Sequence, residues 1–420
     1  MKEPGVERSP SLGLFAGFGI ELEYMIVDSK ELSVLPVSDQ LLKQVAGRFV
    51  NEVGVGELAW SNELALHVVE LKTNGPAATL NGLAAFFQRD IARINGLLAD
   101  LGGRLMPTAM HPWMDPHSET RLWPHEYSPI YEAFNRIFGC QGHGWSNLQS
   151  MHINLPFAND REFTQLHAAI RLILPILPAL AASSPIMDRR TTGTMDNRLA
   201  VYRDNARRVP SVSGQVIPEA VFTRRDYERR ILEKIYRDLQ PYDPEGILRY
   251  EWVNARGAIA RFDRDAIEIR VLDVQECPAA DLAFAALIVT VLRALTEEAW
   301  QDLRRQRQWE VASLAAIYTG AVRDAEMTII EDRAYLEAFG YPERGRCRAH
   351  ELWQHLIESL LLNAQSSTTE WHDSLKNYLR HGSLARRIVT ATGDSPTRER
   401  ITEVYRSLSD CLAMGMSFAP

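Results

Sequence analysis

The sequence predicts an α+β fold in which an antiparallel sheet carries helices on one face and a helical region follows at the C-terminus. Two observations carry this prediction. Four short stretches alternate apolar and polar residues, which is typical of antiparallel strands with one covered face and one open face. From Leu282 onward the pattern is almost wholly helical, with no strong strand after Val274. We therefore divide the 420 residues into a sheet-containing domain, 1–300, and a helical region, 301–420, packed on it.

The first predicted strand runs from Phe18 to Val27 and has the clearest period of two. Ile20, Leu22 and Tyr24 share one face, so Glu21 and Glu23 project together from the other. The other predicted strands repeat this division into an apolar and a polar face; they are Leu64 to Leu71, Ser150 to Leu155, and Ala266 to Val271. Two carboxylates thus share one polar surface, and further polar groups can join them from neighbouring strands.

The predicted helices have the 3.6-residue apolar period and recognisable boundary residues. Thr79 can cap the first one and Gly102-Gly103 can stop it. The predicted helices are Leu80 to Leu101, Glu162 to Ala182, Asp226 to Leu239, Leu282 to Arg307, His350 to Leu362 and Thr397 to Leu412. The stretches Pro107 to Pro129 and Ser211 to Pro218 are irregular, and we expect them to be loops over the open face of the sheet.

Composition excludes several classes of protein. There are 46 Lys and Arg against 54 Asp and Glu, a net charge of −8 without a basic tract, which argues against nucleic-acid binding. The longest apolar stretch, Ile170 to Ile186, contains Arg171 and three prolines and predicts a buried helix, so we expect no membrane span. The four cysteines are far apart and no secretory leader precedes them, which favours reduced thiols in the cytoplasm.

Acidic residues recur on or near three of the four predicted strands, as Glu21, Glu23, Glu63, Glu70 and Glu268; the remaining strand carries His152, and Arg270 lies beside Glu268. A single Glu-x-Glu is ordinarily a solvated strand edge. Several converging carboxylates are different, because two of them 4 Å apart repel by about 4 kcal/mol at an effective dielectric constant near 20. Such a cluster requires cations, and oxygen donors with one imidazole suit Mg²⁺ or Mn²⁺, which commonly bridge to substrate phosphates.

Other candidates are weaker. Gly13, Gly17 and Gly19 precede a strand and match no phosphate-loop or dinucleotide pattern. The histidines His111, His143 and His167 lack paired metal-ligand spacing, and Cys140 lacks an orienting group. The aromatic run Trp113, Trp123, Tyr127 and Tyr131 is interpreted as loop packing, because few basic residues interleave with it. Five arginines are either a solvated face or a clamp for an anionic substrate: Arg189, Arg190, Arg203, Arg207 and Arg208.

Six segments in register resemble the motifs of the type 2 glutamate-cysteine ligase (carboxylate-amine ligase) family, from about residue 13 to 300. They are Gly19-Ile20-Glu21-Leu22-Glu23-Tyr24, Val69-Glu70-Leu71-Lys72-Thr73, Met151-His152-Ile153-Asn154, Ala182-Ser183-Ser184-Pro185, Val201-Tyr202-Arg203 and Ala266-Ile267-Glu268-Ile269-Arg270-Val271. The resemblance departs at Ser150, where many members have a histidine, and at Thr191-Thr192-Gly193, where an acidic residue is usual. These departures concern the choice of substrate.

The resemblance implies a glutamine-synthetase-like catalytic domain that cradles ATP and Mg²⁺ (or Mn²⁺). By matching position, Glu21, His152 and Glu268 would hold one metal, and Glu23 and Glu70 a second. It also implies that Glu63 lies near the amine acceptor and that Arg270, Arg203 and Arg256 face phosphate or a substrate carboxylate; we assign catalytic roles to Arg270, Glu63 and Arg203.

Family members activate the side-chain carboxylate of glutamate as an acyl phosphate, which an amine then attacks to form an amide. We therefore expect an ATP-dependent ligase that joins glutamate to an amine such as cysteine. The alternatives are the same chemistry on another amine or on a peptide or protein substrate, a guanidino kinase, and a non-catalytic nucleotide-binding regulator. The sequence leaves the oligomeric state open, a homo-oligomer included.

Overall fold

An antiparallel sheet organises the computed structural model, which describes residues 11–342, 345–362 and 369–420. Seven strands form one path and an eighth, β5, pairs with the other end of β1. The path runs in the order β2 (Glu52–Val55), β3 (Leu58–Asn62), β4 (Val68–Thr73), β1 (Gly19–Asp28), β6 (Ser150–Pro156), β10 (Ala266–Asp273) and β9 (Ala258–Arg261), and β5 is Gly103–Met106. Every one of these pairings is antiparallel, so the predicted sheet is confirmed.

Strand β1 lies at the centre, and its register brings polar residues together. Glu23 is paired with Glu70 of β4, and Glu21 is paired with His152 of β6. In β10 the register shifts between Ile269 and Leu272, a bulge-type irregularity beside Arg270. Irregularities of this kind re-aim side chains and are common next to active sites.

Three helices cover the apolar face of the sheet: α2 (Leu83–Ala99), α6 (Asp160–Ile173) and α11 (Pro278–Thr296). Ile20, Leu22 and Ile153 are fully buried on that face. Two helical stretches, Asp160–Ala181 and Pro278–Thr296, are long and apolar enough to cross a membrane, but 89% and 83% of their apolar windows are buried inside the protein. Such burial is typical of core helices, as predicted for Ile170 to Ile186.

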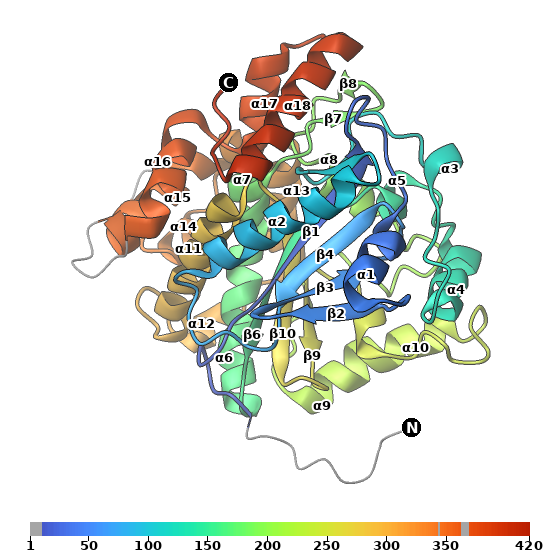
Figure 1. Cartoon of the computed structure of the whole chain (residues 1–420). Helices are drawn as coiled ribbons and strands as arrows, with labels where there is room; N and C mark the ends of the chain where they lie inside the picture. Colours follow the sequence, from blue (N-terminus) through green and yellow to red (C-terminus); the bar gives the residue numbers. More distant parts are fainter. Residues whose placement is uncertain (1–10, 343–344, 363–368) are drawn as a thin grey trace.

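The C-terminal helices, red in Figure 1, pack against the sheet-containing part of the chain. Helix α18 (Arg398–Met414) contacts α2 and β5, and α16 (His372–His381) contacts α11. The other helices of the region are α12 (Leu303–Gln306), α13 (Val311–Asp324), α14 (Arg333–Glu337), α15 (Ala349–Ile357) and α17 (Leu384–Thr392). One continuous apolar core includes residues of the sheet and of α13, α14, α15, α16 and α18, while Leu384 and Ile388 of α17 belong to a second apolar cluster.

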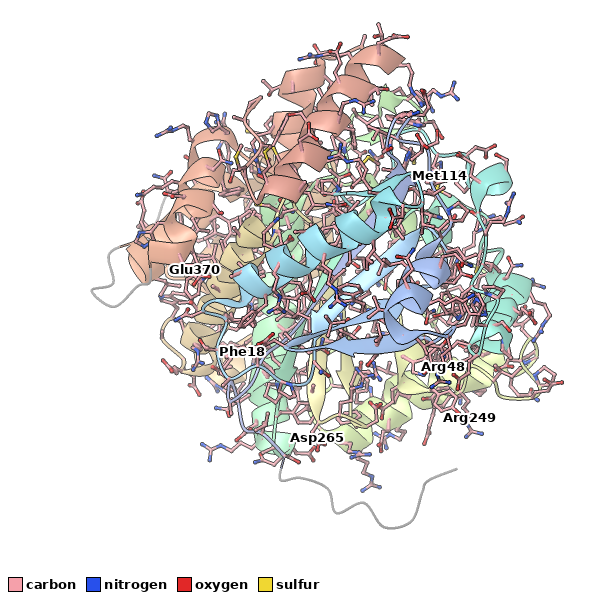
Figure 2. All side chains as sticks on the ribbon, viewed as in Figure 1. Phe18, Arg48, Met114, Arg249, Asp265 and Glu370 are labelled. Carbon is pink, nitrogen blue, oxygen red and sulfur yellow. The ribbon has the colours of Figure 1, made fainter. Side chains whose placement is uncertain are left out.

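Short elements complete the described part of the chain. They are α1 (Ser38–Ala46), α3 (Pro116–Glu119), α4 (Ser128–Phe138), α5 (His143–Ser146), η1 (Leu174–Ile176), α7 (Leu177–Ala181), β7 (Ile186–Met187), β8 (Arg190–Thr191), α8 (Asn197–Tyr202), α9 (Arg224–Tyr227), η2 (Glu228–Leu232), α10 (Glu233–Leu239), η3 (Glu251–Val253), η4 (Ala325–Met327), β11 (Ile329–Ile330), β12 (Cys347–Arg348), η5 (Glu358–Leu362) and η6 (Thr369–Trp371). Phe18, which precedes β1, and Asp265, which precedes β10, lie at one end of the sheet, as Figure 2 shows.

Some predicted boundaries were wrong. The stretch Leu64 to Leu71 becomes a strand only at Val68, and the helix predicted over Leu282 to Arg307 ends at Thr296. The helical region also contains a two-stranded sheet, β11 with β12. Each difference reflects tertiary pairing or a turn that periodicity does not encode.

The buried histidine His167 gives a test of core packing. Its ring stacks on Phe163 at 5.2 Å and 19°, and burial lowers its pKa to about 3. Because the unfolded pKa is near 6.5, the unfolded chain binds the extra proton first, so this group removes stability as pH falls below 6.5. Relative to the parent, His167→Phe should therefore gain about 2 to 3 kcal/mol of unfolding free energy between pH 7.5 and 4.5. Denaturant unfolding at both pH values measures the difference in unfolding free energy between the variant and the parent. If this difference does not change with pH, His167 is not buried as a neutral ring.

Candidate active site

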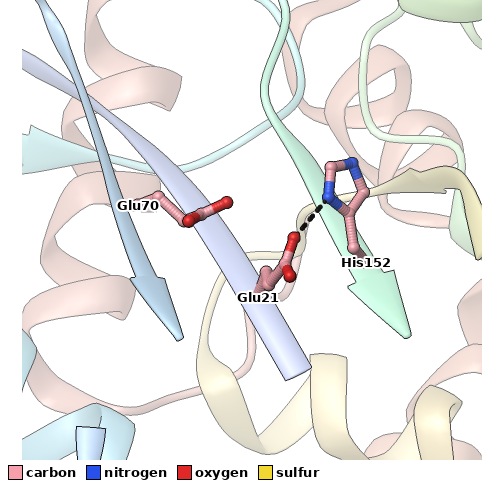
Figure 3. A group of neighbouring side chains, drawn as sticks. All are labelled: Glu21, Glu70 and His152. Carbon is pink, nitrogen blue, oxygen red and sulfur yellow. Dashed lines mark hydrogen bonds and ion pairs between the residues drawn. The ribbon is translucent and has the colours of Figure 1, made fainter. Parts of the chain in front are cut away.

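A cluster of carboxylates and one imidazole lies on the polar face of the sheet (Figure 3). His152 Nδ1 is 2.7 Å from Glu21 Oε2, and His152 Nε2 is 2.9 Å from the hydroxyl of Ser150. The Ser150 hydroxyl also lies 2.9 Å from Glu23 Oε2, to which it can donate its proton. His152 is thus linked directly to Glu21 and through Ser150 to Glu23.

The charges of this cluster are strongly coupled. Burial would raise the pKa of Glu21, but the hydrogen bond and charge of His152 lower it to about 2. Burial opposes protonation of His152, while Glu21 raises its pKa overall. Burial and the charge of Glu21 raise the pKa of Glu70 to about 7, and burial with the charges of Glu23 and Glu70 raises the pKa of Glu63 well above its usual range. The cluster cannot hold all its negative charges without added cations.

Glu268 extends the cluster on β10. Its Oε1 is 3.9 Å from His152 Nδ1 and 2.9 Å from Arg270 Nε, and its Oε2 is 3.3 Å from Arg261 Nη1. The contact with Arg270 Nε is an ion pair without hydrogen-bond alignment. The guanidinium of Arg270 therefore donates no hydrogen bond from Nε to Glu268.

Two sets of side chains are close enough to share a metal ion. Glu21, Glu70 and His152 form one, and Glu23, Glu63 and Glu70 the other; within each set the ligand atoms lie within 4.8 Å of one another. Oxygen donors with at most one imidazole are the ligands of Mg²⁺ and Mn²⁺. The donor chemistry and the raised pKa values of Glu63 and Glu70 fit such ions.

Two cavities open on either side of this cluster. The first has a volume of about 490 Å³, and its polar wall includes Glu23, Glu63, His152, Arg198 and Arg270. The second has a volume of about 670 Å³ and a wall of mostly polar and small residues, among them Gly17, Phe18, Gly19, Glu21, Lys72, Asn74, Gly75, Asn154, Arg264 and Asp265. The hydrogen-bonded pair Glu21 and His152 thus has one member in the wall of each cavity.

The structure brings together most of the residues singled out in the sequence. Glu21, Glu23, Glu63, Glu70, His152, Glu268 and Arg270 all belong to the cluster or its cavities. Arg203 is exposed and pairs with Asp204 at 3.6 Å, and Arg256 is buried against Glu219 at 2.6 Å. Neither Arg203 nor Arg256 lines either cavity, and the roles assigned to them stay predictions.

Sequence inspection missed Arg198, which lines the first cavity. Its Nε donates to Asp273 at 2.5 Å, and its terminal nitrogens lie 3.3 and 3.4 Å from the carbonyl of Arg270. The available signal was helical spacing: Arg198 and Tyr202 are four residues apart on α8 and share a face, and Tyr202 also lines the cavity.

Two solved structures of ligases resemble this fold. The glutamate-cysteine ligase of Francisella tularensis, solved in complex with AMP, is similar with a TM-score of 0.61 over 94% of this chain and 88% of that one, at 12% identity. A bifunctional glutathione synthetase of Pasteurella multocida is similar with a TM-score of 0.56 over 96% of this chain and 52% of that one, at 14% identity. At these identities the likeness concerns the fold.

The family follows from the sequence comparison. The model of glutamate-cysteine ligase family 2 (GCS2) matches residues 17–407, and the chain belongs to this family of carboxylate-amine ligases. An uncharacterized protein of Archaeoglobus fulgidus is 38% identical over 67% of this chain and 75% of its own length. A Bradyrhizobium protein named "Putative glutamate--cysteine ligase 2" is 27% identical over 66% of this chain, and the match spans 60% of that relative.

Proposed function

We propose that the protein is an ATP-dependent ligase that activates the side-chain carboxylate of glutamate as an acyl phosphate and joins it to an amine. The observation that carries this proposal is the pair of cavities separated by the hydrogen-bonded Glu21 and His152. A nucleotide and a carboxylate can approach such a cluster from opposite sides, as in-line phosphoryl transfer requires.

The second cavity suits the nucleotide. Lys72 and Arg264 supply positive charge there, and Gly17, Gly19 and Gly75 allow close approach of a ligand to the backbone. Mg²⁺ or Mn²⁺ held by Glu21, Glu70 and His152, and by Glu23 with Glu70, would neutralise phosphate charge when bound. Burial opposes the charge of Lys72, but Glu70 and Glu52 raise its pKa, so it stays cationic at neutral pH.

The first cavity suits the reacting carboxylate and the amine. A carboxylate oxygen attacks the γ-phosphorus and ADP leaves; the amine then attacks the acyl carbon and phosphate leaves. Arg270 stabilises charge on the transferred phosphoryl group, because it lines this cavity beside Glu268. Glu63 accepts the proton of the attacking amine, a role favoured by its raised pKa.

The proposal extends to the cellular compartment and to the kind of substrate. Within the described residues all four cysteines are buried free thiols, which agrees with a reducing compartment, and we propose the cytoplasm. A peptide or protein that presents the carboxylate or the amine remains the alternative substrate.

Hydroxylamine captures an acyl phosphate as a hydroxamate and therefore tests the proposal without knowledge of the natural amine. We expect glutamyl hydroxamate only when glutamate, ATP and Mg²⁺ or Mn²⁺ are all present. Glu21→Gln and Glu268→Gln should lower its rate at least about 100-fold, because they weaken the hold on the metal and phosphates. Glu57→Gln, at an exposed glutamate paired with Arg89, is the control. If the parent protein forms no hydroxamate, the proposed ligase activity is wrong. If Glu21→Gln and Glu268→Gln form hydroxamate as fast as the parent, the assignment of these residues to metal binding is wrong.

A further inference from the structure

The first cavity has an apolar and aromatic end that the activation of glutamate does not use. The apolar and aromatic part of its wall consists of Leu64, Ala65, Val68, Tyr127, Ile130, Tyr131, Phe134, Trp145, Leu148, Trp252 and Val253. These residues come from α4, α5, η3, the start of β4 and the segments next to these elements. Cavities that bind apolar ligands have this composition, with a few polar groups that fix the orientation.

The aromatic rings at this end form a connected wall. The ring of Phe134 is 5.2 Å from that of Trp145 and 5.9 Å from that of Trp252. Tyr250 stacks on Trp252 at 5.4 Å and 11° although it is 54% exposed, and the cavity-lining Tyr127 is 45% exposed. Large aromatic side chains exposed beside an apolar cavity mark a place where a ligand ring can be buried.

Cationic side chains are few among the described residues that line this cavity. Among the described lining residues only Arg198 and Arg270 carry guanidinium groups, and none is a lysine. Arg198 is already engaged by Asp273, and Arg270 lies beside Glu268 at the carboxylate cluster. A carboxylate buried against the aromatic wall would have no cation of its own, which is costly.

Glu63 lies between these two environments. Its carboxylate belongs to the set formed with Glu23 and Glu70, and it lines the cavity next to Leu64 and Ala65. An ammonium group placed at Glu63 has its nitrogen at the carboxylate cluster and the rest of its molecule at the aromatic wall.

We infer that the amine acceptor is an arylalkylamine: a primary amine on a short chain that carries an aromatic ring and no carboxylate. This inference rests on the proposed function, since it names the second substrate of the same site. Cysteine fits the cavity less well, because it brings a carboxylate and lacks a ring to fill the apolar end.

A matched set of amines tests the inference with the parent protein, glutamate, ATP and Mg²⁺. 2-Phenylethylamine is compared with ethylamine, which lacks the ring, with L-phenylalanine, which adds a carboxylate, and with L-cysteine. Phosphate release and product mass are measured. We expect kcat/KM for 2-phenylethylamine to exceed each of the others at least about 10-fold, the discrimination expected from burial of a ring and exclusion of an unpaired charge. A preference for L-cysteine or equal use of ethylamine overturns the inference.

Truncation of the wall locates the ring. Trp252→Ala should lower kcat/KM for 2-phenylethylamine at least about 10-fold and leave KM for ATP within about twofold. Trp300→Ala is the matched control, because Trp300 is also a partly buried indole and does not line the cavity. A rise in KM for ATP in Trp252→Ala would instead assign the wall to adenine and overturn the inference.

Hydroxamate formation distinguishes failure of the proposed ligase activity from failure of the inferred amine. If glutamyl hydroxamate forms while 2-phenylethylamine is not used, the inference fails and the proposed function stands. If no hydroxamate forms, both fail.

Discussion

Replacement of Arg270 by lysine is expected to lower kcat about 100- to 1,000-fold, while the free energy of unfolding changes little. Lysine keeps the charge that Glu268 faces at 2.9 Å. It loses the planar fork that can contact two phosphoryl oxygens at once, and loss of one preorganised donor at developing charge has an effect of this size. Steady-state rates of phosphate release and denaturant unfolding measure the two quantities.

Arg261 provides the matched control. It also contacts Glu268, at 3.3 Å, and it pairs with Asp263 at 3.0 Å, but it does not line the first cavity. We expect Arg261→Lys to keep kcat within about threefold, because it preserves an ion pair and touches no reacting group. Equal losses in both variants would mean that Arg270 acts only by supporting Glu268.

The centre of the sheet could be predicted because its signal is local. In the first half of β1 apolar residues alternate with polar ones. A strand with one buried face shows this period of two whichever strands it pairs with. The same pattern predicts β6 and β10, and it places Glu21, Glu23, His152 and Glu268 on the polar faces of their strands. The pairing of Glu21 with His152 then completed the cluster.

The short strands could not be predicted from pattern. Strands β2, β5 and β9 have four residues each, too few to display a period, and they exist because longer neighbours offer hydrogen bonds. In β3 all five residues are buried, so no alternation of polarity marks it. Tertiary pairing decides such segments.

The arginines show the limit of motif matching. The motif Val201-Tyr202-Arg203 suggested that Arg203 faces a ligand, but one helical residue turns the side chain by about 100°. With Tyr202 on the cavity, Arg198 shares its face and Arg203 lies in solvent. Helical geometry therefore places Arg198 in the cavity wall, and the role assigned to Arg203 stays a prediction.

The sequence also does not predict the aromatic wall of the first cavity. The aromatic run from Trp113 to Tyr131 predicts loop packing, and for Trp113 and Trp123 this is confirmed, since both are buried. Tyr127 and Tyr131 instead line the cavity. Their partner Trp252 lies more than a hundred residues away, so only the folded chain brings these rings together.

Transfer of an ¹⁸O label from the carboxylate has the largest expected contrast of all. The cluster holds carboxylates, one imidazole and a guanidinium group, and all described cysteines are buried, with pKa values raised by burial for Cys140, Cys277, Cys347 and Cys411. In the proposed mechanism no side chain forms a covalent intermediate, and the substrate carboxylate itself attacks the γ-phosphorus. Its oxygen then leaves with phosphate when the amine displaces it.

The decisive measurement is therefore the isotopic composition of the phosphate released from [¹⁸O]carboxylate-labelled glutamate, ATP, Mg²⁺ and an accepted amine. The account predicts one labelled oxygen in each inorganic phosphate, with ADP as the nucleotide product. Label in AMP with release of pyrophosphate, or phosphate without label, would contradict the acyl-phosphate mechanism.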